Sequence, residues 1–245
     1  MTNSLPTTLP LSKLVTEMQE SATLKMAKMA RELKAQGKDV IDLSLGEPDF
    51  DTPVHIKEAA KKALDDGYTK YTPVNGLLEL RQAIVNKLAR ENDLHYTVNQ
   101  IVVSNGAKQS VYNLCMALLD PGDEVILPAP YWVSYAEIVK MAGGVPVIAN
   151  SSIEQDFKST PEEIEALITD RTKFILYSSP CNPSGSVFSF EELQALALML
   201  QAHEHVLVVS DEIYEHINFT DRHYTIASME GMKDRTVIIN GMSKG

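Results

Sequence analysis

The sequence has 245 residues, enough for one large domain or for one domain with part of a second. Its hydrophobic content of 44% indicates a globular protein, and its net charge of -11 argues against a nucleic-acid surface, which requires clustered Lys and Arg. Two cysteines, Cys115 and Cys181, are too few for a disulfide-stapled secreted fold and predict a cytoplasmic protein. A polar N-terminus and the lack of long apolar runs predict no secretory signal and no membrane-spanning segment.

Three helices are predicted in the first hundred residues. Apolar side chains at helical spacing predict a helix over 21–36, in which Met26 and Met29 are expected to be core residues. A second helix is predicted over 52–66 and a third over 77–88. The Pro-containing start of the chain is expected to be an arm.

Short apolar runs alternate with helical stretches in the remainder of the chain. The runs are IVVS at 101, EVILP at 124, VPVIA at 145, KFILYS at 173, VLVVSD at 206 and TVIIN at 236. Strands that lack polar alternation and are separated by helices predict an α/β fold with a mostly parallel sheet sandwiched by helices. Ligands of such sheets bind at the carboxyl ends of the strands.

Two of the predicted strands end in groups suited to an anion or to an oriented ligand. IVVS is followed by Gly106, Ala107 and Lys108, a turn whose free backbone N–H groups at a helix N-terminus can hold a phosphate. The same kind of turn often serves packing alone, so both interpretations stay open. KFILYS is followed by Asn182 between two prolines, which fix the direction of its amide, although an ordinary turn uses the same residues.

Two further strands end in an acid and in a lysine. Asp211 closes VLVVSD, with Tyr214 three residues later, and a buried acid needs a cationic partner; a helix-capping role is the alternative. Lys244 follows TVIIN, and desolvation makes a lysine amine nucleophilic toward an aldehyde, although a lone lysine is most often a solvated surface charge. A phosphate cradle, an amide, a buried anion and an amine are the groups that pyridoxal 5'-phosphate requires.

Eight segments of the sequence resemble the class I, fold-type I aminotransferases, and most closely their bacterial aspartate (aspartate/prephenate-type) branch. They are SLGEPDFDTP, KYTPVNGLLELR, SNGAKQ, DPGDEV, PAPYWVSY, SSPCNPSG, SDEIYEH and NGMSKG, in the order found in that family. The resemblance implies an N-terminal arm and the first part of a small domain over 1–48. It implies an incomplete cofactor-binding large domain over 49–245.

The resemblance implies a role for each matching residue around the cofactor ring. Lys244 would form the Schiff base and act as the general acid and base of the proton shift. Asp211 would pair with the pyridinium nitrogen, while Tyr214 and Asn182 would hydrogen-bond the ring's phenolic oxygen. Trp132 would stack on the ring, its alternative being an aromatic core residue. Trp132 and Asn182 would also contact the substrate.

Other matching residues are implied to bind phosphate and substrate. Gly106, Ala107 and Lys108 would hold the phosphate, and Tyr71 resembles the tyrosine that reaches the phosphate of a neighbouring subunit, which implies a homodimer with shared sites. Gly46 lies in the loop that meets the substrate carboxylate. Lys108 stands near the distal carboxylate, which favours aspartate or another dicarboxylic amino acid, with 2-oxoglutarate as the 2-oxo acid.

The chain departs from the family pattern at three positions. Cys181 and Ser184 replace an Asn and a Thr, which should be tolerated, and Gly241 replaces a serine that contacts the phosphate, which leaves that contact open. His203 and His205 are two residues apart and face different directions, so no metal site is predicted.

The resemblance also implies that family members continue well past the lysine, with an arginine for the substrate and one further strand between the segments at 101 and 236. The chain alone is therefore expected to be inactive and to be part of a longer transaminase. The alternatives are a non-catalytic truncated fragment, a lyase or synthase of the same fold, and a ligand-sensing module of a transcription regulator.

Overall fold

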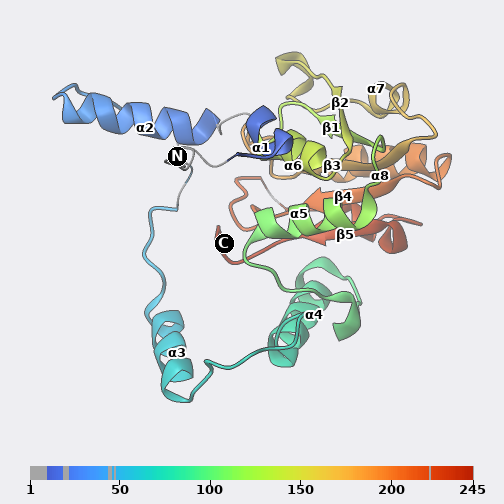
Figure 1. The fold of residues 1–245 in the computed structure, drawn as a ribbon. Coiled ribbons are helices and arrows are strands. Elements are labelled where there is room, and N and C mark those ends of the chain that lie inside the picture. The colour runs from blue at the N-terminus through green and yellow to red at the C-terminus, as the bar shows by residue number, and fades with distance from the viewer. Residues whose placement is uncertain (1–9, 19–21, 44–45, 47, 221, 245) are drawn as a thin grey trace, which may run out of the picture.

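A computed structural model describes residues 10–18, 22–43, 46, 48–220 and 222–244 (Figure 1). Its α-helices are α1 (Lys13–Glu17), α2 (Ala22–Ala35), α3 (Val54–Asp65), α4 (Leu78–Asn92), α5 (Ala107–Leu118), α6 (Ser134–Met141), α7 (Pro161–Glu165) and α8 (Phe190–Gln201). Its strands are β1 (Glu124–Pro128), β2 (Val145–Ala149), β3 (Thr172–Ser178), β4 (Leu207–Asp211) and β5 (Thr236–Ile239). Short 3-10 turns are η1 (Val98–Gln100), η2 (Ile153–Gln155), η3 (Ile226–Ser228) and η4 (Lys233–Arg235).

The strands form one parallel sheet with the order β2-β1-β3-β4-β5. In its register, Ser178 of β3 lies beside Asp211 of β4, and Asp211 lies beside Ile239 of β5. Three neighbouring strands therefore finish level with one another. The polar segments that follow them start from the same edge of the sheet, as the sequence predicted.

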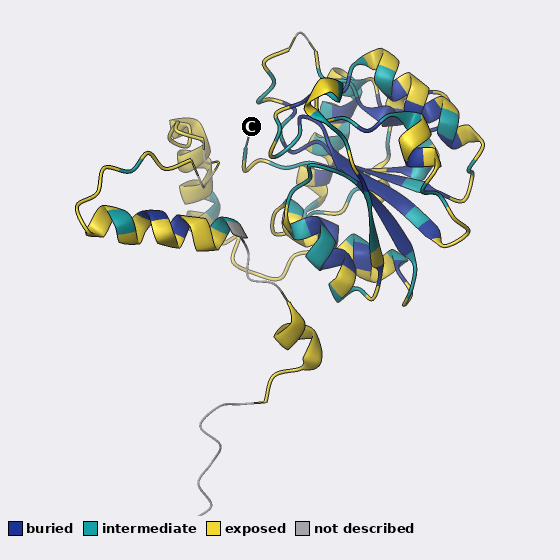
Figure 2. Ribbon diagram, turned by 90° about the horizontal axis from the view of Figure 1, so that it is seen from above, coloured by how far each residue is buried: buried dark blue, intermediate teal, exposed yellow. Residues whose placement is uncertain are grey.

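Helices cover both faces of this sheet, which confirms the predicted α/β fold (Figure 1). On one face α5 and α6 pack against Val125 and Phe174. On the other face α7, α8 and the η3–η4 region pack against Ile126 and Ile175. Because alternate residues of a strand point to opposite faces, both sets of side chains must be apolar. Figure 2 shows the buried residues concentrated in this part of the molecule.

The predicted strand at 101–104 is not formed in the described chain, so the expectation of six strands is wrong by one. A strand exists only where a neighbour completes its hydrogen-bond ladder. Val103 N–H instead donates to the Asn75 carbonyl at 3.2 Å. The resemblance placed another strand between this segment and β5, and no described segment of the chain lies there.

The three helices predicted before residue 100 form as α2, α3 and α4, but two of them lie away from the sheet; the short helix α1 was not predicted. Figure 1 shows α2 and α3 projecting from the main body, and α3 has no buried residue. Met26 and Met29 of α2 are 52% and 46% exposed, so their assignment to the core is wrong for the chain as described. The apolar periodicity is correct, but α2 has little to pack against. The predicted arm falls mainly on residues 1–9, outside the described residues.

None of the described helices combines the length and the apolar character needed to cross a membrane.

Candidate active site

Asp211 lies at the end of β4 and is buried, with 3% of its surface exposed. Its Oδ2 accepts a hydrogen bond from the Tyr135 hydroxyl at 2.5 Å, and its Oδ1 accepts one from the Ile213 N–H at 3.2 Å. Burial raises the pKa of the Asp211 carboxyl to about 6, although the hydrogen bonds from Tyr135 and Ile213 oppose that shift. Among the described residues no cation pairs with this carboxylate, so the site fits a ligand that brings a positive charge.

Tyr135 is a site residue that the sequence analysis missed. It lies on α6, three residues after Trp132, and the two rings meet edge to face with their centroids 5.4 Å apart. Burial and the charge of Asp211 raise the pKa of the Tyr135 hydroxyl well above its usual range, so this hydroxyl keeps its proton and donates a hydrogen bond to the carboxylate. Its position one helical turn after Trp132 in PAPYWVSY was the available signal.

Lys108 extends this row of side chains toward the N-terminus of α5. Its Nζ lies 4.8 Å from the centroid of the Trp132 ring, within cation–π range. Lys108, Trp132, Tyr135 and Asp211 therefore form a continuous row from α5 through α6 to the end of β4. The structure brings three of the predicted residues together in this row.

Asn182 and Tyr214 meet on the segments that follow β3 and β4. The Asn182 amide Nδ2 lies 3.5 Å from the Tyr214 hydroxyl, at the long limit of a hydrogen bond. Burial raises the pKa of Tyr214, the Asn182 hydrogen bond lowers it, and the nearby charge of Asp211 raises it. The two side chains thus lie in the same site as Asp211, as predicted.

The N-terminus of α5 is open toward a ligand. Gly106 is the N-cap residue with a φ of +83°, and no side chain caps the helix. The Gln109 and Ser110 N–H groups donate to the Gly106 carbonyl, whereas the first N–H groups of the helix, those of Ala107 and Lys108, are available to an anion. A Cβ at Gly106 would meet nothing within 4 Å, so glycine is required here by its backbone conformation and not by packing.

Lys244 and Gly46 lie together although 198 residues separate them in sequence. The Lys244 Nζ donates a hydrogen bond to the Gly46 carbonyl at 2.8 Å. The implied Schiff-base lysine therefore lies at the loop that the resemblance assigned to the substrate carboxylate. Tyr71, in contrast, is fully exposed at 108%, and its predicted role toward a neighbouring subunit stays a prediction.

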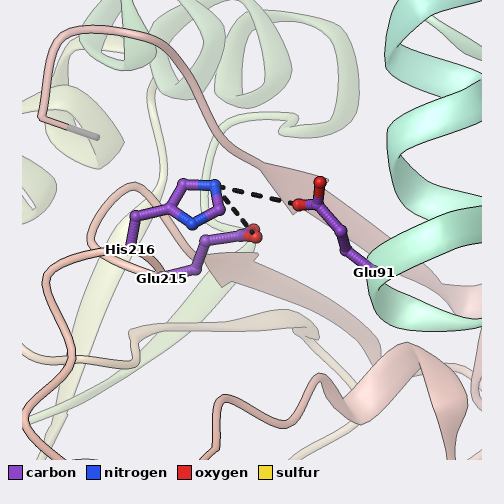
Figure 3. Close-up of side chains that lie close together, drawn as sticks. All are labelled: Glu91, Glu215 and His216. Carbon is purple, nitrogen blue, oxygen red and sulfur yellow. Dashed lines mark ion pairs between the residues drawn. The ribbon is translucent and has the colours of Figure 1, made fainter.

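Other clusters of ionisable side chains have structural partners. Figure 3 shows Glu91, Glu215 and His216, where the His216 Nε2 lies 3.9 Å from Glu91 and 3.5 Å from Glu215. Lys87 pairs with both carboxylates, and Asn240 donates to Glu215. These residues form an ion-pair network that links α4 to the segment after β4.

His203 and His205 have different partners, as their spacing predicted. His203 contacts the Glu165 carboxylate at 3.0 Å, and His205 contacts the Thr169 carbonyl at 3.2 Å. Cys115 of α5 is completely buried in the core, and this burial raises the pKa of its thiol to about 11.

Sequence comparisons relate this chain to aminotransferases. The family model for aminotransferases of class I and II matches residues 38–245. The aspartate/prephenate aminotransferase of Nitrosomonas europaea is 49% identical over 236 residues, which cover 96% of this chain and 59% of that protein. The aspartate aminotransferase of Geobacillus stearothermophilus is 50% identical over 236 residues, covering 96% of this chain and 60% of that protein.

Solved structures of aminotransferases are also similar to this chain. The aspartate aminotransferase of Thermus thermophilus with maleate superposes with a TM-score of 0.91 at 45% identity, covering 97% of this chain and 61% of that one. The aspartate aminotransferase of Rhizobium meliloti superposes with a TM-score of 0.93 at 44% identity, covering 97% of this chain and 60% of that one. The chain thus spans about three fifths of the length of these relatives.

Proposed function

Since the chain belongs to the aminotransferase family of classes I and II, we propose that it carries the cofactor site of a pyridoxal-phosphate-dependent transaminase. The observation that carries this proposal is Asp211, a buried carboxylate with two hydrogen-bond donors and no cation among the described residues. A buried carboxylate of this kind is costly unless a positive charge joins it. A protonated pyridine ring is such a charge.

Pyridoxal phosphate, when bound, supplies an aldehyde and a ring that accepts electrons. Lys244 is the amine that would hold the aldehyde and then carry a proton to and from the substrate. Asp211 would keep a proton on the ring nitrogen. Tyr214 and Asn182 would orient the ring through its phenolic oxygen, and Trp132 would cover its face.

The N-terminus of α5 would bind the phosphate. The N–H groups of Ala107 and Lys108 belong to its uncapped first turn, where the helix dipole also favours an anion. Gly106 permits the backbone conformation that presents them. This part of the site acts through the backbone, so it tolerates side-chain changes better than changes of conformation.

We further propose a dicarboxylic amino acid as substrate, with 2-oxoglutarate as the acceptor. The Lys108 ammonium group beside Trp132 supports this choice, because it offers a cation to a second carboxylate. The relatives are named for aspartate and prephenate, and the Thermus thermophilus structure contains maleate; all three are dicarboxylates. Gly46, beside Lys244, would meet the other carboxylate through its backbone.

Three predictions about the whole molecule remain proposals. A homodimer with Tyr71 reaching the partner is supported by the full exposure of that side chain. A division between residues 1–48 and 49–245 is supported by the separation of α2 from the sheet in Figure 1. A cytoplasmic location is supported by the two free cysteines.

The proposed function predicts that Lys244 captures the cofactor covalently. Incubation with pyridoxal phosphate and reduction with borohydride should place a pyridoxyl group on the peptide that contains Lys244, measured by mass spectrometry. Lys244→Arg should abolish the label, whereas Lys108→Arg, which keeps a cation near Trp132, should retain it. A label on another lysine of the wild-type chain, or no label, would overturn the assignment.

A further inference from the structure

Glu212 follows Asp211 directly but points to the opposite face of the sheet. Its Oε1 accepts hydrogen bonds from Ser210 at 2.9 Å and from Thr225 at 2.5 Å, and only 1% of its surface is exposed. The Tyr177 hydroxyl lies 3.1 Å from the same Ser210 oxygen, which can accept its hydrogen bond. Glu212 is therefore a second buried acid beside Asp211, and the mechanism outlined above does not use it.

His223 is the group that approaches the other oxygen of this carboxylate. Its Nε2 lies 3.0 Å from Glu212 Oε2, and its side chain is 8% exposed. Its Nδ1 is buried and has no partner among the described residues, so Glu212 is the hydrogen-bonding partner of the ring there. One ring nitrogen of His223 and one carboxylate oxygen each from Glu212 and Glu215 lie within 4.8 Å of one another.

The other titratable groups around this pair do not supply the missing positive charge. They are Tyr177 of β3, Tyr96 of the segment after α4, Lys87 and Glu91 of α4, Glu215 and His216 after β4, and Tyr135 of α6 beside Asp211. Burial raises the pKa of both Tyr177 and Tyr96, and the charge of Glu212 raises each further, so both hydroxyls are neutral. Lys87 is already paired with the Glu215 carboxylate. Among the described residues, His223 is thus the hydrogen-bonding partner of Glu212 that can carry a positive charge.

From this arrangement we infer that Glu212 and a protonated His223 form a buried ion pair. The two charges of the pair cancel, so that, among the described residues, Asp211 alone carries an uncompensated negative charge at the end of β4. His223 is on this view a positioning residue, which acts through Glu212 and Asp211. The inference rests on the proposed function, because it assigns Asp211 the task of holding a cationic ring. Without the proton on His223, two adjacent buried carboxylates would oppose each other's ionisation. The pKa of Asp211, raised mainly by burial, is raised further by the charge of Glu212.

A metal ion bound by Glu212, Glu215 and His223 is a weaker interpretation of the same cluster. Both oxygens of Glu215 already have partners, Lys87 and Asn240. Glu212 Oε1 has two hydroxyl donors, as described above. A carboxylate that accepts hydrogen bonds from so many donors fits a buried ion pair better than a cation site.

The inference is tested by titrating the Asp211 carboxyl in the cofactor-free chain. Carbon-13 NMR of protein labelled at aspartate carboxyls would follow it, with the signal assigned by its loss in Asp211→Asn. His223→Gln keeps a donor near Glu212 but cannot carry the charge, so the Asp211 midpoint should rise by about one pH unit. Glu212→Gln removes the opposing charge, so the midpoint should fall. The double variant, Glu212→Gln with His223→Gln, should return close to the wild-type value.

A matched control and a second measurement complete the test. His203→Gln removes an imidazole from a carboxylate at the same 3.0 Å distance but at an exposed pair, and should leave the Asp211 midpoint unchanged. On acidification the protein should lose bound pyridoxal phosphate, and the absorbance of the bound cofactor measures the pH midpoint of this loss. That midpoint should shift in the same order among the variants. The inference is overturned if His223→Gln leaves the midpoint unchanged, or if both single variants move it in the same direction, as a purely structural role would. If the NMR midpoints of the variants shift as expected but the wild-type chain binds no pyridoxal phosphate, the proposed function is rejected and the ion pair is kept.

Discussion

At the scale of single residues, Asp211 shows a conflict between stability and function. Its carboxyl is buried where two hydrogen bonds only partly offset desolvation, and this raises its pKa to about 6. The folded protein therefore holds this proton at pH values where the unfolded chain, with an ordinary carboxyl pKa near 3.8, has released it. A carboxyl whose pKa is raised in the folded state contributes most to stability below about pH 4, and this contribution is lost as the pH rises through about 6.

Asp211→Asn removes this titration and should stabilise the cofactor-free protein at neutral pH. The difference in the free energy of unfolding between variant and wild type should grow by roughly 3 kcal/mol between about pH 4 and pH 7.5, because about two pKa units correspond to that energy. Urea unfolding across this pH range measures the difference. Asp170→Asn, at an exposed aspartate, is the control and should show no such trend. A difference for Asp211→Asn that stays constant with pH would contradict a raised pKa for the Asp211 carboxyl.

At the scale of elements, the start of α5 combines a strained backbone position with an uncapped helix end. Gly106 has a φ of +83°, and Gly231, in the loop between η3 and η4, has a φ of +75°. A Cβ at either position would meet nothing within 4 Å. The two glycines therefore have similar backbone requirements and differ in whether a helix N-terminus follows.

Gly106→Ala should lower both stability and cofactor affinity, whereas Gly231→Ala should lower stability alone. Each substitution forces an alanine into a backbone conformation with positive φ, which costs about 1 kcal/mol or more. Only the change at Gly106 should also turn the N–H groups of the α5 N-terminus away from a phosphate, weakening binding by about tenfold or more. Urea unfolding and titration with pyridoxal phosphate measure the two effects. Equal cofactor affinities of the two variants would contradict the phosphate role of this turn.

The sequence predicted elements best where local pattern and tertiary packing agree. The runs that became β1 to β5 are apolar on both faces, because helices cover both faces of the sheet. The segment at 101–104 has the same pattern but forms no ladder, since a strand depends on a neighbour that its own residues do not specify. The prediction that Met26 and Met29 are core residues was wrong for a related reason. Helical periodicity indicates an apolar face without showing what covers it.

The candidate site was predicted where a side chain follows a strand end and missed where it lies elsewhere. Asp211 was singled out because a polar residue that closes a buried strand is unusual, and the structure places it at the buried end of β4. The role of Lys244, five residues beyond β5, stays a prediction. Tyr135 looks like an ordinary aromatic residue of a helix until the fold brings it to Asp211. His223 lies in a loop with no periodic pattern, so its contact with Glu212 could be found only in three dimensions.

At the scale of the whole molecule, the exposed apolar residues lie mainly outside the sheet and its helices. Tyr68, Tyr71 and Val74 follow α3 in an extended segment and are all exposed. Isolated exposed apolar residues are common on soluble proteins, but a group of aromatic and aliphatic side chains in one segment is typical of an interface. This supports the proposed homodimer.

Val74→Glu should weaken this self-association, because it places a charge in the proposed interface. Leu198→Glu changes an equally apolar, exposed residue on α8 and should leave association unchanged. Analytical ultracentrifugation of both variants and of the wild type measures the monomer–dimer equilibrium. Dissociation by both changes, or a monomeric wild-type protein, would contradict an interface at this segment.

The strand order has a consequence for how the chain folds while it is being synthesised. β1 is made first and lies inside the sheet; β2 pairs with one of its edges, and β3, β4 and β5 then add in turn to the other side. Each new strand therefore finds its neighbour already in place, so the sheet can grow in the order in which the ribosome delivers it. Tyr135 emerges 76 residues before its acceptor Asp211, and the lysine comes last. A nascent chain halted between these points would hold Tyr135 without its acceptor and β3 with an unpaired edge, because β4 supplies both partners.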